Sequence, residues 1–458
     1  MTLNDILNQN ELENITTSNI PPICYESFYF SNQKLLQELN DQLLNPHDLE
    51  VLTLENKLLQ DLSSTSKTLL DLTGNIFWVY ESLEINKTLA DLNFFHDKSL
   101  SAKSYSKVGY LSKILFEKTN DSHWLDFGSE NFKKSAELYS SLNDNLAAQD
   151  YHLSAEFSKN IFELTGDLTK LHDAYYTYQL SANHSLSFNK KYSLNNFKKS
   201  GDVSKTLFEK TGDLMWAYNY FKDYDLASKI AINLDHPQTP LLFSFKADAS
   251  KILFEKTGLI DWAYEWVDGE KSSVELLDEK DKLYCRLHPN DKSKTYKKQS
   301  AYTHAIIGDV SKILFELTGK LDHAIDFFKH YRLSAEKSNK SDERHSAYAH
   351  GVSGDAAILI YNKTNDLNWA IKGAKSHKTC AEKSEFFDKK HSLHVYSLAG
   401  NDFRKVFEKT RDKSFAKEAI SCYKKFLDYY DINPSEKYSR TINVTRSNME
   451  YLLRAINS

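Results

Sequence analysis

One eight-residue phrase recurs along this chain at a nearly constant interval, and it constrains the fold more than any other feature. Ser-Lys-Ile-Leu-Phe-Glu-Lys-Thr stands at 112–119 and again at 250–257. Its closing threonine or that of a close variant marks eight positions: Thr73, Thr119, Thr165, Thr211, Thr257, Thr318, Thr364 and Thr410. Successive threonines lie 46 residues apart, apart from one interval of 61. Such a period is typical of stacked supersecondary units that bury a continuous core together.

The spacing inside one unit predicts a helical hairpin. Apolar or small residues precede the threonine by 14, 10, 7, 4 and 3 positions, which places them on one face of a helix. The position ten residues before it is small: Gly109, Ala155, Gly201, Ala247, Gly308, Gly354 and Gly400. Gly or Asn follows the threonine in seven units, as expected at a helix C-terminus, and Arg411 follows it in the eighth. An aspartate then provides a second helix with an N-cap in five units: Asp121, Asp167, Asp213, Asp366 and Asp412.

Turn residues are scarce, which argues against a β fold. The 458 residues include only 14 Gly and 7 Pro, too few for the many turns of a sandwich or barrel. We therefore expect an all-α, right-handed α-solenoid of about eight antiparallel helix hairpins. The hairpins should occupy residues 51–430, with an insertion near 277–299. Residues 1–50 and 431–458 should form N- and C-terminal helical caps.

The unit resembles the tetratricopeptide repeat. The resemblance rests on the small residue and phenylalanine of the first helix, the Gly-Asp turn, and alanine followed by an aromatic residue on the second, and it is strongest over Gly319–Phe328. The period departs from that family, at 46 residues rather than 34. In addition, Lys312 stands near an expected glycine, and no proline closes the unit. HEAT-type repeats match the period and are the alternative; either type forms an α-solenoid.

Charged side chains also recur at fixed positions of the first helix. A basic residue precedes the threonine by six positions and an acidic one by two, so the two can pair at i, i+4. A charged groove that binds a peptide terminus or acidic motif would use these residues: Lys113, Lys159, Lys205, Lys251, Lys312, Glu163, Glu209, Glu255 and Glu316. We favour the alternative, a salt-bridge ladder that fixes repeat register, because a residue kept in nearly every unit serves what all units share.

Positions where the repetition fails are the better candidates for function. In the unit of Thr364, Ile358 replaces the lysine and Asn362 the glutamate. His304 and His350 replace aromatic residues in adjacent units; two histidines alone make no metal site, so we interpret them as core substitutions that could also line a groove. We expect the insertion at 277–299 to be the one long loop and a candidate partner contact.

No catalytic, nucleotide-binding or metal-binding motif is recognisable, so we expect neither an enzyme nor a cofactor. The leading hypothesis is a cytoplasmic scaffold or adaptor that binds a protein or peptide in the solenoid groove. Four dispersed cysteines and the lack of a membrane-spanning apolar run favour that location without membrane contact.

Charge is unevenly distributed, which leaves two alternatives open. Residues 1–100 carry 5 Lys and Arg against 15 Asp and Glu, a net charge of −10, whereas residues 291–430 carry 26 against 18, a net charge of +8. The basic half could bind nucleic acid through its phosphates. The acidic end of one molecule could also meet the basic end of another in head-to-tail self-association.

Overall fold

The structure, a computed structural model, describes residues 21–41, 49–287, 296–433 and 438–457. The regular secondary structure of these residues is entirely helical. The chain divides into two compact units, one ending at Trp216 and the other beginning at Ala217. In both, helices that are consecutive in sequence pack against each other, so the all-α repeat architecture is confirmed.

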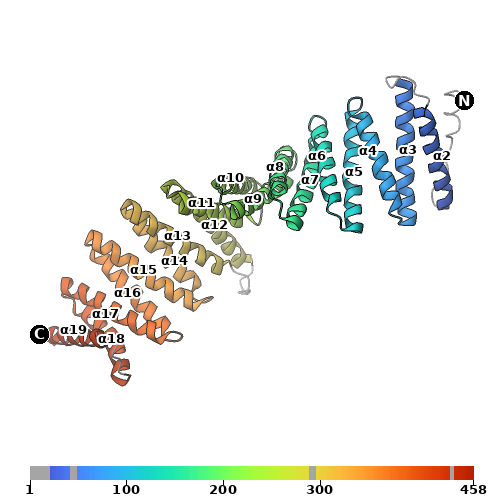
Figure 1. Cartoon of the computed structure of the whole chain (residues 1–458). Coiled ribbons are helices and arrows are strands. Elements are labelled where there is room, and N and C mark those ends of the chain that lie inside the picture. The colour runs from blue at the N-terminus through green and yellow to red at the C-terminus, as the bar shows by residue number, and fades with distance from the viewer. Residues whose placement is uncertain (1–20, 42–48, 288–295, 434–437, 458) are drawn as a thin grey trace. The chain divides into compact units, whose positions relative to one another are not determined.

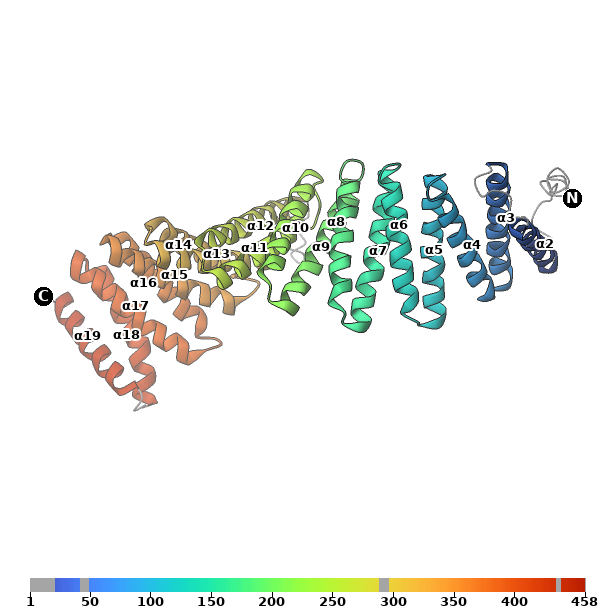
Figure 2. The ribbon, with the colours of Figure 1, turned by 45° about the horizontal axis from the view of Figure 1, so that its top comes forward.

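The first unit consists of helical hairpins, seen side by side in Figures 1 and 2. Its helices are α2 (Pro22–Asp41), α3 (Leu49–Thr73), α4 (Phe77–Asn93), α5 (Lys98–Thr119), α6 (His123–Tyr139), α7 (Asp144–Thr165), α8 (Leu168–Ser185) and α9 (Lys190–Thr211). From α3 onward, each odd-numbered helix ends at a closing threonine and is the first helix of a hairpin. The beginning of α10 (Leu214–Asn233) also belongs to this unit.

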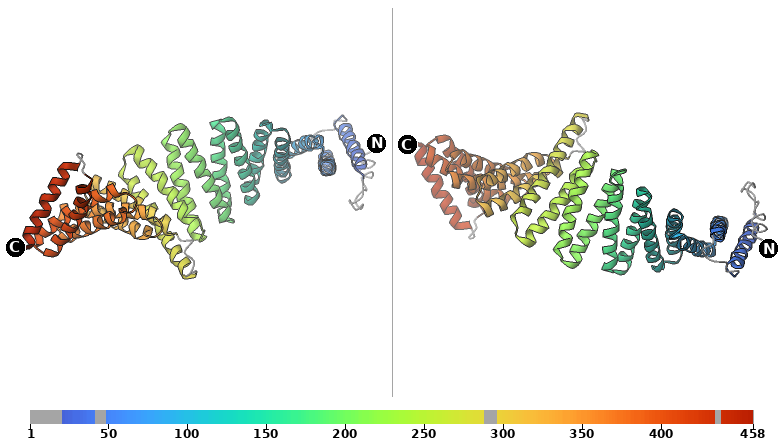
Figure 3. Two further views of the ribbon diagram at one scale, coloured as in Figure 1. Left: turned by 90° about the horizontal axis from the view of Figure 1, so that it is seen from below. Right: turned by 90° about the horizontal axis from the view of Figure 1, so that it is seen from above.

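The second unit continues the same pattern, as the two views of Figure 3 show. After the main part of α10 come α11 (Thr239–Thr257), α12 (Ile260–Leu287), α13 (Lys297–Thr318), α14 (Leu321–Ser338), α15 (Glu343–Thr364), α16 (Leu367–Ser384), α17 (Lys389–Thr410), α18 (Lys413–Ile432) and α19 (Ser439–Asn457). Within the described residues, no helix is long and apolar enough to cross a membrane.

The closing threonine has a structural role that explains its recurrence. In every unit its hydroxyl donates a hydrogen bond to the carbonyl four residues earlier and accepts one from the amide two residues later; at Thr318 these distances are 2.6 and 3.2 Å. The next residue is left-handed in all eight units, including Arg411 at φ 58°. The five predicted N-cap aspartates each accept an amide hydrogen bond, as Asp167 does from Thr169 at 2.9 Å. The predicted turn chemistry is therefore confirmed.

The small residue of the first helix is required by a ring on the second. Thirteen residues after the threonine stand Phe132, Tyr178, Tyr224, Tyr331 and Tyr423, with Glu270 and His377 in two units. A Cβ added to Gly308 would lie 2.4 Å from the Tyr331 ring, and one added to Gly109 would lie 2.7 Å from Phe132. The hydroxyl of Tyr331 also donates to Asp309, the residue after that glycine. We call these side chains the ring column.

Serines join each hairpin to the next at the opposite end. Ser101, Ser193, Ser346 and Ser392 each donate to the carbonyl of an alanine eleven residues earlier, at 2.7 to 2.9 Å. All four serines are buried. Since a buried hydroxyl without a partner would be costly, these bonds help to fix how successive hairpins align.

The insertion differs from our expectation of a long loop beginning at 277. Helix α12 runs on to Leu287, because residues 277–287 contain neither glycine nor proline and consist largely of good helix formers. The added turns are anchored: Asp278 accepts from Lys337 at 2.7 Å and from Ser300 at 2.6 Å. Residues 288–295 lie outside the described part, and α13 begins at Lys297.

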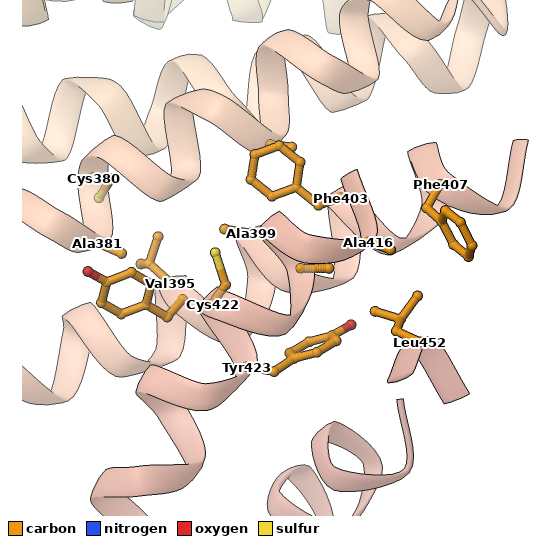
Figure 4. Packing of buried hydrophobic residues seen from close by; sticks show 13 residues of the cluster. Cys380, Ala381, Val395, Ala399, Phe403, Phe407, Ala416, Cys422, Tyr423 and Leu452 are labelled. Atoms are coloured by element: carbon orange, nitrogen blue, oxygen red, sulfur yellow. The ribbon is translucent and has the colours of Figure 1, made fainter. Parts of the chain in front are cut away.

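Helices beyond the repeats cover both outer hairpins. Tyr29 of α2 is buried and packs edge-on against Trp78, with ring centroids 5.1 Å apart. At the other end, Leu452 of α19 belongs to the same apolar cluster as Phe403, Phe407 and Tyr423 (Figure 4). These contacts remove from solvent the apolar faces that an end hairpin would otherwise expose.

Candidate functional site

The lysine and glutamate positions of the first helices form exposed pairs within single helices. Lys159 and Glu163 approach to 2.8 Å, and the other recorded lysine pairs, Lys113–Glu117, Lys251–Glu255 and Lys312–Glu316, to 3.8 or 3.9 Å. These side chains are 41 to 59% exposed, so each pair contributes little to stability. Lys205 is half-buried and Glu209 exposed at the corresponding positions. The recorded pairs of these columns thus lie within single helices and present alternating charge to solvent.

The two substitutions in the unit of Thr364 have different surroundings. Ile358 packs on α16: its Cδ1 would be 2.7 Å from a Cβ built on Gly373, so the missing side chain there makes room for it. Asn362 is exposed near the end of α15. The loss of the lysine therefore adds apolar contact between α15 and α16, while the loss of the glutamate changes only the surface.

The two histidines named from the sequence lie in different environments. His304 is buried, and its Nδ1 is 3.0 Å from Nδ1 of His330 on the next helix. Its Nε2 is 3.7 Å from Asp278. His350 instead faces a surface hollow. Within the described residues, no group of three or more His, Cys, Asp or Glu could hold a metal ion.

Ion pairs join successive second helices at two interfaces, through a pair of recurrent positions that sequence reasoning missed. The basic member lies fourteen residues after one closing threonine, and the acidic member eight residues after the next. Lys271 of α12 pairs with Asp326 of α14 at 3.0 Å. Lys378 of α16 pairs with Glu418 of α18 at 2.7 Å. We call these positions the bridge column.

Between α10 and α12 both bridge-column positions carry acids, and a buried lysine pairs with both of them. Asp225 of α10 and Glu265 of α12 take the two positions. Lys246 of α11 is only 7% exposed, and its Nζ lies 3.1 Å from Asp225 and 3.2 Å from Glu265. Since like charges across a helix interface repel, this lysine compensates for the irregular pair.

At another step, between α14 and α16, the bridge column carries two cations. Arg332 and Lys372 take the two positions. Arg332 turns back to Glu336 on its own helix at 2.9 Å. The Nζ of Lys372 lies 3.9 Å from the centre of the Trp369 ring. No acid side chain in the described residues pairs with Lys372, whose charge is compensated there only by cation–π contacts with Trp369 and, at 5.8 Å, Phe328.

A hollow of about 220 Å³ lies at this step, and we call it the α14–α16 groove. Its lining residues are Phe328, Arg332, Glu336, His350, Lys372, Lys375, Ser376 and Thr379. Three cations thus face one carboxylate. The pKa of His350 falls to about 4 because burial disfavours its charged form and the neighbouring cations Lys383 and Arg332 repel it. His350 is therefore neutral at pH 7 and adds a polar surface without a further charge.

Two units place a titratable group in the ring column. Glu270 is 4% exposed, and its pKa rises to about 8 because burial and the nearby Asp248 both disfavour the carboxylate, although Lys251 opposes them. Burial would lower the pKa of His377, but hydrogen bonds to Asp355 and Asp402 raise it to about 9. Both groups are enclosed between helices, which favours a structural role over contact with a ligand.

The known proteins that are similar to this chain are solved structures of low sequence identity. No protein-family model matches the chain, and no curated protein is significantly similar to it. Among solved structures, a circular tandem repeat protein with novel repeat topology is similar at 10% identity and a TM-score of 0.31, over 95% of this chain and 99% of that one.

Two natural proteins are similar over comparable lengths. They are the human IFIT1 dimer with PPP-AAAA (13% identity, TM-score 0.18, 93% of this chain and 94% of that one) and yeast Tom70 (12%, 0.16, 94% and 96%).

The groove cations escaped sequence reasoning because lysines are common throughout residues 291–430 and alternate there with acids. The signal was nevertheless present. Asp326, Lys372 and Glu418 each stand eight residues after a closing threonine and so occupy equivalent positions of the second helices. Lys372 is the basic residue in that set.

Proposed function

We propose that this protein is a non-catalytic interaction scaffold and that the α14–α16 groove is where it binds a segment of another protein. The observation that carries the proposal is the pair Arg332 and Lys372. The two neighbouring interfaces pair a base with an acid at these positions. Here Glu336 pairs with Arg332 alone, and no described residue links Arg332 and Lys372 as Lys246 links Asp225 and Glu265. A surface that leaves such a charge uncompensated favours a partner that compensates it.

The remaining recurrent positions support a scaffold rather than an enzyme. The threonines close turns, the ring column fills the hairpins, and the serines align them, so the repeats position helices without assembling reactive groups. Repeat arrays use such surfaces for extended contacts, with specificity supplied by the units that differ.

Site-specific photo-crosslinking tests the proposal. A photoreactive amino acid is placed at Ser376 in the groove and, as a control, at Asn368, an exposed residue of the same helix outside it. In cells of the source organism, a discrete protein adduct is expected at Ser376 and none of the same mass at Asn368. Equal adduct patterns at both positions, or no adduct at Ser376, would contradict a groove-directed partner.

A further inference from the structure

We infer that the α14–α16 groove binds an acidic peptide segment, with an aspartate or glutamate carboxylate seated between Arg332, Lys372 and Lys375. This inference rests on the proposed function and specifies the chemistry of the partner. It follows from the bridge column, where each neighbouring step shows what that interface needs for charge balance.

The neighbouring steps supply the comparison. Lys271 has Asp326, and Lys378 has Glu418, each through a direct ion pair. Where two acids meet instead, Lys246 lies between them. Between Arg332 and Lys372 the complementary group would be an anion. Among the described residues, Glu336 pairs with Arg332, and no carboxylate pairs with Lys372. A carboxylate from a partner would stand there as Lys246 stands between Asp225 and Glu265.

The groove walls favour a peptide side chain over a free ion. Phe328 lines the groove, with its ring centroid 5.1 Å from that of Trp369, so an apolar surface adjoins the cations. The side chain of Ser376 has no hydrogen-bond partner among the described residues and can donate to a carboxylate oxygen. Lys372 needs only to leave the face of Trp369 to pair with a ligand. An acidic residue beside an apolar one would satisfy all of these groups.

The charges are too few and too localised for nucleic acid. A nucleic-acid strand presents a phosphate at every nucleotide and needs a continuous basic track. Here the basic residues of the two neighbouring interfaces are already paired: Lys378 with Glu418 between α16 and α18, and Lys271 with Asp326 between α12 and α14. The free positive charge therefore spans a single step of the array, which suits one or two carboxylates.

Fluorescence anisotropy with the full chain tests the inference. The probe is a labelled ten-residue peptide of alternating glutamate and alanine with one central leucine, titrated at low salt. Saturable binding is expected, with at least about tenfold loss when the glutamates become glutamines or when salt is raised to about 0.5 M. A phosphoserine peptide and a single-stranded oligonucleotide serve as competing probes. If either binds more tightly than the glutamate peptide, the assignment to carboxylates is wrong.

The decisive variant is Lys372→Glu. It restores the usual acid of the bridge column and allows Arg332 to pair across the interface, so the protein should fold at least as well as the parent while its affinity for the peptide falls at least about tenfold. Lys363→Glu, which makes the same charge change at an exposed residue of α15 outside the groove, should bind normally. If both variants lose the same affinity for the peptide, the effect depends only on net charge and the inference is wrong. If Ser376 yields a crosslinked partner but no acidic peptide binds, the scaffold function stands and only this inference fails.

Discussion

The buried carboxyl of Glu270 should make the stability of the second unit depend on pH near neutrality. Its folded-state pKa is about 8, mainly because burial disfavours the charged form, whereas an exposed glutamate has a pKa of about 4.5. The folded state therefore holds its proton more tightly than the unfolded state. The free energy of unfolding must decrease as pH rises from 4.5 to 8, and it is insensitive to this group outside that window.

The size of the effect follows from the two pKa values. Between pH 5.5 and pH 8, the unfolded glutamate is almost fully ionised, while the folded one begins to ionise only at the upper limit. Integrating the difference in bound protons over this range gives a loss of about 3 kcal/mol in unfolding free energy. Glu270→Gln removes the titration and should remove that loss.

Urea unfolding monitored by tryptophan fluorescence at pH 5.5 and pH 8 measures the difference. Glu275→Gln, an exposed acid of the same helix, is the matched control and should keep the parent's pH dependence. Other groups also titrate in every variant. The quantity to compare is therefore, for each variant, the difference between its unfolding free energies at pH 5.5 and pH 8. If Glu270→Gln and Glu275→Gln respond equally to pH, Glu270 does not hold its proton near neutrality and the argument from burial fails.

Three further substitutions probe the turn, the ring column and the bridge column. Arg411→Gly should raise stability by about 0.5 to 1 kcal/mol in thermal unfolding, because Arg411 is left-handed at φ 58°; a decrease would mean that its side chain matters more than its backbone. Gly400→Ala should lower the free energy of unfolding by about 1 to 2 kcal/mol, although alanine has the better helix propensity, because the new Cβ would lie 2.5 Å from the Tyr423 ring. Unchanged stability would show that the ring moves aside freely. Lys246→Met should cost about 2 to 4 kcal/mol at pH 7 by leaving Asp225 and Glu265 facing each other. Burial would raise the pKa of Asp225, but hydrogen bonds from Lys229 and Lys246 hold it below its usual value, so this cost should shrink as Asp225 protonates in acid. A cost independent of pH would contradict the electrostatic explanation.

Features encoded within a few consecutive residues could be predicted from the sequence. The turn after each threonine and the aspartate N-caps depend on neighbours two to four residues away, and the structure confirms them. The prediction of a long loop beginning at residue 277 is wrong. Residues 277–287 have the composition of a helix and extend α12. Excess residues in a repeat indicate an insertion but do not indicate its conformation.

Contacts that join separate helices could be predicted from the sequence only in part. The small residue at Gly308 was recognised as a packing position, but its partner Tyr331 lies 23 residues later, and the two meet only once the hairpin closes. The pairing of His304 with His330, rather than with His350, depends in the same way on helix rotation. That the exposed Lys and Glu columns bind a partner remains a prediction.

The closing threonine makes each hairpin corner self-sufficient. Both partners of its hydroxyl lie within four residues of it, so the corner needs nothing from the hairpins on either side. An array assembled from such corners can gain or lose a whole 46-residue period by duplication or deletion without any new turn having to evolve. The serine contacts, which repeat with the same period, would then align whichever hairpins become neighbours. The number of units is therefore a variable that selection or protein engineering can adjust separately from the groove.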